Sequence, residues 1–116
     1  MQDRPNAVEL IEAIREFLER DVMSSAEGRV RFHTRVAVNA LGMLDRELRL
    51  GPDLDAAERQ RLAALLGHDA DVPTLTAELA RRIRDGSLDD RRDEVMLAVR
   101  ESVRAKLLVS NPSYVG

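Results

Sequence analysis

Apolar residues recur at three- and four-residue intervals along most of this 116-residue chain. That spacing places the apolar side chains on one face of an α-helix, whereas a half-buried strand alternates apolar and polar residues. No window of the sequence shows such alternation. The pattern therefore predicts an all-α fold, a compact bundle of about five helices that forms one domain over residues 1–116.

Glycine and proline set the expected helix boundaries. Gly51-Pro52 is expected to end the second helix because proline lacks a backbone N–H, while Gly67 and Gly86 suit the ends of the third and fourth helices. The first, second and fifth helices are long and the third and fourth are short. We expect them at residues 7–22, from a start between Ser24 and Arg29 to about residue 50, and at residues 56–66, 74–85 and 90–109.

Composition excludes several functional classes. The chain has no cysteine, so disulfides, thiolate zinc sites and cysteine nucleophiles are ruled out. Its net charge of −3 and its three aromatic residues argue against a nucleic-acid partner, which usually requires a basic surface or stacking side chains. No apolar run approaches the ~20 residues of a membrane span. We expect a cytoplasmic protein with no membrane partner and no cofactor.

The second helix carries a broad apolar arc, and His33 falls inside it between Ala40 and Leu44. His33 is interpreted either as a core or subunit-interface histidine or as a general base or ligand. Glu47 lies near the same arc, but fourteen residues along a helix correspond to about 21 Å, so it cannot pair with His33 within one helix. Gly42, on the polar side, is expected to let another backbone approach.

A basic stripe on the second helix is the candidate ligand site, and Arg31, Arg35, Asn39 and Arg46 form it. Forked arginine donors suit a phosphate, a carboxylate or an acidic partner helix. The alternative is a solvated face paired with nearby acids. His68, Asp69 and Asp71 form a short polar cluster that lacks a calcium-loop pattern and is interpreted as an inter-helix turn.

The segments 4–10, 17–18, 31–41, 46–48, 83–86, 106–107 and 111–112 together resemble a small bacterial domain family of unknown function. Members of that family occur alone or with aminoglycoside-phosphotransferase-like kinases, and lie near acyl-CoA dehydrogenases. The resemblance implies an accessory role and supplies no catalytic residues.

We expect a non-catalytic accessory or interaction domain, associated with a kinase-like or acyl-CoA-dehydrogenase-type enzyme. Because the second helix is too long to be covered by two short helices, we also expect a homodimer. The alternative is a module that binds an acyl-CoA or another phosphorylated metabolite through the basic stripe. An enzyme that combines His33 and Glu47 from different helices or subunits is the least favoured hypothesis.

Overall fold

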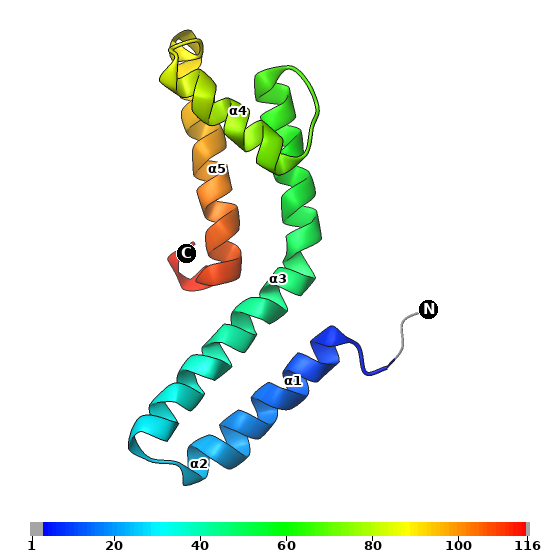
Figure 1. Cartoon of the computed structure of the whole chain (residues 1–116), viewed down its shortest axis with the longest axis vertical. Coiled ribbons are helices and arrows are strands. Elements are labelled where there is room, and N and C mark those ends of the chain that lie inside the picture. The colour runs from blue at the N-terminus through cyan, green and yellow to red at the C-terminus, as the bar shows by residue number, and fades with distance from the viewer. Residues whose placement is uncertain (1–3, 116) are drawn as a thin grey trace. The chain divides into compact units, whose positions relative to one another are not determined.

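The computed structural model describes residues 4–115, and it confirms the all-α prediction, with no strand among those residues. Helix α1 (Ala7–Phe17) continues through a π-helical turn (Leu18–Val22) into the short α2 (Met23–Ser25). The remaining helices are α3 (Gly28–Leu66), α4 (Val72–Arg84) and α5 (Arg92–Ser110) (Figure 1). A 3₁₀ turn precedes α5 at Asp89–Arg91, and another follows it at Pro112–Tyr114.

The predicted break at Gly51-Pro52 is wrong, because α3 is one helix of 39 residues with Pro52 inside it. It contains both the second and the third predicted helix, so the expected count and lengths are corrected. A proline inside a helix removes one hydrogen bond and crowds the carbonyl four residues earlier. Leu48 and Pro52 are both exposed, so water can satisfy the carbonyl that loses its helical partner.

The chain divides into two compact units with the boundary between Arg49 and Leu50. In unit 1, α1 and the first part of α3 run antiparallel (Figure 1). Their shared interior is small and holds Ile11 on α1 and Thr34 and Val38 on α3. The Thr34 hydroxyl is satisfied by donating to the Val30 carbonyl at 2.7 Å. Unit 1 therefore buries only a narrow strip of each helix.

The helix cap at Asn6 and the close approach at Gly42 are two local features of unit 1. The Asn6 side chain accepts a hydrogen bond from the Glu9 amide at 2.9 Å and forms the capping box that begins α1. At Gly42, side chains approach rather than a backbone: a Cβ there would lie 3.5 Å from Nη1 of Arg46 and 3.7 Å from Nη2 of Arg15. The expected backbone approach is therefore wrong.

Unit 2 holds the main core, which is formed by the end of α3 with α4 and α5. Eight apolar residues make this cluster: Leu62, Leu65, Leu66, Leu75, Leu79, Leu88, Val95 and Ala98. Asp71 caps α4 by accepting from the Thr74 amide at 2.9 Å, and Pro73 occupies the first turn. Gly67 and Gly86 adopt φ values of 88° and 79° directly after α3 and near the end of α4, as expected for residues that end helices.

Candidate functional site

In the single chain, most of the apolar arc of the second predicted helix is exposed to solvent, and so is His33. The face of α3 that is buried against α1 instead centres on Thr34 and Val38. His33 is exposed and meets Phe32 edge-on, with ring centroids 5.4 Å apart. Burial of His33 in a core is therefore ruled out within the chain, while the subunit-interface interpretation stays open.

The four residues of the basic stripe differ in their surroundings. The Arg31 guanidinium donates to the carbonyl of Met23, the first residue of α2, so part of its hydrogen-bonding capacity is used by the fold. Arg35 and Asn39 are exposed, and Arg46 is half-buried beside Gly42. The four residues lie along the polar side of α3, and the pockets described below are lined by other residues.

Acidic side chains of α1 lie near this polar side of α3. Arg49 donates to Glu12 at 2.7 Å and to Asp45 at 2.9 Å. The hydrogen bond that Asp45 accepts contributes most, and with the interaction with Glu12 it raises the pKa of Arg49 above its ordinary value. Arg49 therefore forms ion pairs within unit 1. This agrees with the alternative interpretation, in which the basic side of the helix is a solvated face paired with nearby acids.

The cluster at residues 68–71 serves the connection between α3 and α4. Nε2 of His68 lies 2.6 Å from Oε1 of Glu78, and Arg59 holds Asp69 through two hydrogen bonds of 2.7 and 3.1 Å. The hydrogen bond from Arg59 lowers the pKa of Asp69. Hydrogen bonds from the Thr74 side chain and amide likewise lower the pKa of Asp71. Each side chain thus has its own structural partner.

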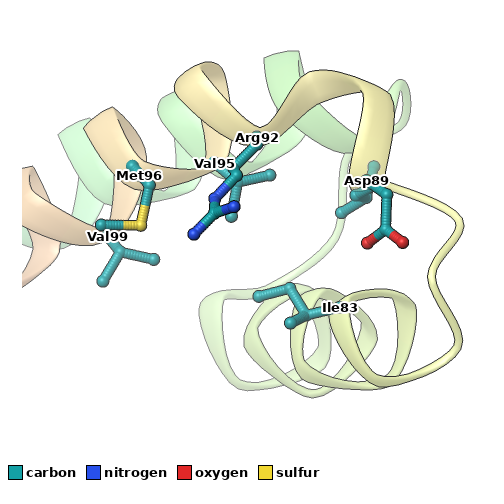
Figure 2. A pocket seen from close by; sticks show the side chains of 7 residues that line it. Ile83, Asp89, Arg92, Val95, Met96 and Val99 are labelled. Atoms are coloured by element: carbon teal, nitrogen blue, oxygen red, sulfur yellow. The ribbon is translucent and has the colours of Figure 1, made fainter.

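A half-open pocket of about 500 Å³ lies between the end of α4 and the start of α5. Figure 2 shows Ile83 of α4 facing Arg92, Met96 and Val99 of α5 across this space. Leu88 and Val95 complete its apolar wall, and Asp89 adds a carboxylate at the turn before α5. The Arg92 guanidinium projects into the gap and makes no ion pair with any residue that the structure describes (Figure 2).

The apolar wall of this pocket continues along α5. Met96, Val99 and Val103 are exposed and recur at three- and four-residue spacing, so they share one side of the helix. We call these three residues the α5 stripe. Arg92 lies at its first end, and the exposed Lys106 lies one turn beyond Val103. This site was not among the sequence predictions, although a cation at each end of an apolar stripe is visible in the sequence.

A second pocket, of about 570 Å³, lies on unit 2 between α3 and another side of α5. Ala64, Leu65, Leu97 and Ala98 form its apolar part, and Arg61, Glu94 and Glu101 its polar part. The Nε and Nη2 atoms of Arg61 are buried and lack a hydrogen-bond partner among the residues that the structure describes. Arg61 as a whole is only partly buried, and buried donors without partners are costly, so an acceptor that reached these atoms would be stabilised.

These features define an all-helical domain with two pockets on unit 2 that are largely apolar and have charged groups at their margins. The family model described as a domain of unknown function, DUF6285, matches residues 24–114. The chain belongs to this family. The match includes α3, α4 and α5 and leaves α1 outside. Searches of curated proteins and of solved structures gave no match.

Across residues 4–115, no helix combines the length and apolar character that crossing a bilayer requires.

Proposed function

We propose that the chain is a non-catalytic interaction domain, and that a partner enzyme docks on the pocket between α4 and α5 and on the α5 stripe. The partner segment is an apolar one flanked by acidic residues. The resemblance noted in the sequence points to a kinase-like or acyl-CoA-dehydrogenase-type enzyme as the source of that segment.

The observation that carries this proposal is the uncovered apolar surface of unit 2. Ile83, Met96 and Val103 are each about half exposed, although they line or extend one continuous pocket wall. Contiguous exposed apolar surface of this kind is typical of protein interaction sites. Arg92 and Lys106 at the two ends supply charges that favour an acidic partner and set its register.

The test is association of the purified chain with each candidate enzyme, followed by isothermal titration calorimetry at micromolar concentration. We expect binding that Met96→Asp weakens at least tenfold, because a carboxylate would be buried against apolar surface. Leu97→Asp is the matched control, since Leu97 is 62% exposed on another side of α5. Equal effects of the two substitutions, or no binding to either enzyme, would reject the proposal.

A small anionic ligand is the second candidate function, and the unpartnered atoms of Arg61 favour it. The ligand class is an acyl thioester or another metabolite with an apolar part and a phosphate or carboxylate. The apolar part would contact Leu65 and Leu97, and the anionic group would accept hydrogen bonds from Arg61. This places the ligand on α3 but away from the basic stripe of the sequence prediction.

Thermal denaturation with millimolar acyl-CoA separates this candidate from the first. A ligand at about ten times its Kd adds roughly 1.4 kcal/mol to stability, which raises the midpoint by several degrees. Arg61→Met should abolish the shift, whereas Met96→Asp should retain it. No shift with the unmodified chain would sink the ligand-binding candidate and leave the interaction domain standing.

A further inference from the structure

The largest apolar surface that the proposed function leaves unused lies on unit 1. Leu10, Ile14 and Phe17 of α1 are exposed, and so are Val30, Val36, Leu44 and Leu48 of α3. We call these seven residues the unit 1 face. On each helix, most of them lie to one side of the residues that contact the other helix, and the sense of rotation is the same on both helices. In an antiparallel pair, that arrangement places both rows on one side of the hairpin.

We propose that the unit 1 face is covered by the same face of a second copy of this chain, with the two α3 helices antiparallel and crossing at Ala40. In this register, a residue any number of positions before Ala40 lies opposite the residue the same number of positions after it. The proposal does not depend on the proposed function, because the pockets of unit 2 play no part in it.

The chemistry of α3 is complementary to itself in this register. His33 of one protomer lies opposite Glu47 of its partner, and both side chains are exposed in the single chain. Val36 lies opposite Leu44, so apolar side chains meet next to the crossing point. Ala40, a small residue at the crossing point, allows the two backbones to approach closely. A two-fold axis repeats each contact twice.

The area also matches what a stable dimer needs. Half-exposed side chains of this size leave roughly 60–100 Å² each, so the face offers on the order of 600 Å² per protomer before small residues are added. A standard interface buries about 800 Å² on each partner. Ala13, Ala37 and Ala40 lie along the same side and add smaller areas.

Sedimentation of the full chain from 1 to 200 µM tests the association. We expect a species of twice the 13.0 kDa chain mass to dominate at high concentration. His33→Glu should weaken dimerisation at least tenfold, because it places carboxylates opposite each other at two positions. The double variant His33→Glu with Glu47→Arg should restore it. Arg20→Gln, an equal charge change on an exposed position of unit 1, is the control and should change nothing.

Cross-linking tests the register, and the absence of native cysteine removes background. Ala40→Cys should form a disulfide-linked dimer on oxidation. Val30→Cys should not, since two such positions would be separated by about 30 Å of helix. Mixing a His33→Cys chain with a Glu47→Cys chain should again give a linked dimer.

Three results would overturn the inference: a monomer throughout the concentration range, a dimer insensitive to His33→Glu, or self-linking of Val30→Cys. The last would indicate parallel helices. Circular dichroism of each variant shows whether it keeps the helical content of the parent, so that loss of dimer is not mistaken for loss of fold.

Discussion

At the scale of single residues, the glycines differ in whether the backbone requires them. Gly67 sits at φ 88°, a conformation that side chains with a Cβ rarely adopt. Gly42 is helical, and a Cβ there would make ordinary van der Waals contacts of 3.5 Å or more with two arginine side chains. The sequence already placed Gly67 at a helix end and Gly42 inside a helix, but which side chains a Cβ at Gly42 would meet depends on the fold.

Gly42→Ala should therefore stabilise the protein by roughly 0.5–1 kcal/mol, because alanine has the higher helix propensity. Gly67→Ala is the matched comparison and should destabilise it. Urea denaturation followed by circular dichroism measures both. Destabilisation by Gly42→Ala would mean that Arg15 and Arg46 cannot move to accommodate the methyl group.

Asp71 links the stability of α4 to pH. Hydrogen bonds from Thr74 hold the pKa of Asp71 below its ordinary value of 3.8 in the folded state. A lowered folded-state pKa contributes stability that is present above 3.8 and is lost as pH falls through the folded value. Stability should thus decline below about pH 4.

The substitution Asp71→Asn isolates this contribution, since asparagine also caps helices but does not titrate. The variant should show a smaller loss of stability between pH 5 and pH 2.5 than the parent, as measured by urea midpoints. Parallel pH profiles for the two proteins would show that the Asp71 cap does not respond to acid.

At the scale of elements, the sequence predicted most helix ends correctly. It failed at Gly51-Pro52, where proline was expected to end a helix. The capping box at Asn6 and the glycines after α3 and α4 are local signals, so sequence reveals them. Pro52 is different, because its cost depends on whether the freed carbonyl can reach water. Periodicity likewise found the apolar arc of α3 but could not tell burial within the chain from exposure.

Pro52→Ala should lengthen the hydrogen-bonded ladder of α3 and raise stability by roughly 1–3 kcal/mol, since interior proline is the least favourable helix residue. Asp53→Ala, at the adjacent exposed position, is the control and should contribute only a few tenths of a kcal/mol. Thermal denaturation with ellipticity at 222 nm as the readout compares them. An unchanged midpoint for Pro52→Ala would indicate that Pro52 imposes no cost on α3.

At the scale of the whole molecule, the candidate sites were less predictable than the fold. The basic stripe was visible as a run of charges, but pairing of charges on that side of α3 depends on acids from α1 and α3, as Arg49 shows. The pocket at Arg92 needs α4 and α5 together, and no local pattern joins Ile83 to Met96. Sites assembled from separate helices need the fold before they can be recognised.

The proposed dimer predicts that thermal stability depends on protein concentration. For a folded state that associates, a roughly hundredfold rise in protein concentration raises the free energy of unfolding by up to about 2.7 kcal/mol. The thermal midpoint then rises by several degrees. His33→Glu should flatten this dependence. Midpoints that coincide for the parent at 2 and 200 µM would contradict association through the unit 1 face.

Lys106, at the far end of the α5 stripe, is the single lysine of the sequence. Its ammonium is exposed, so an amine-reactive fluorophore has one side-chain target in the native chain. A dye attached there would sit beside the docking surface, and its emission or anisotropy would report occupancy without any engineered residue.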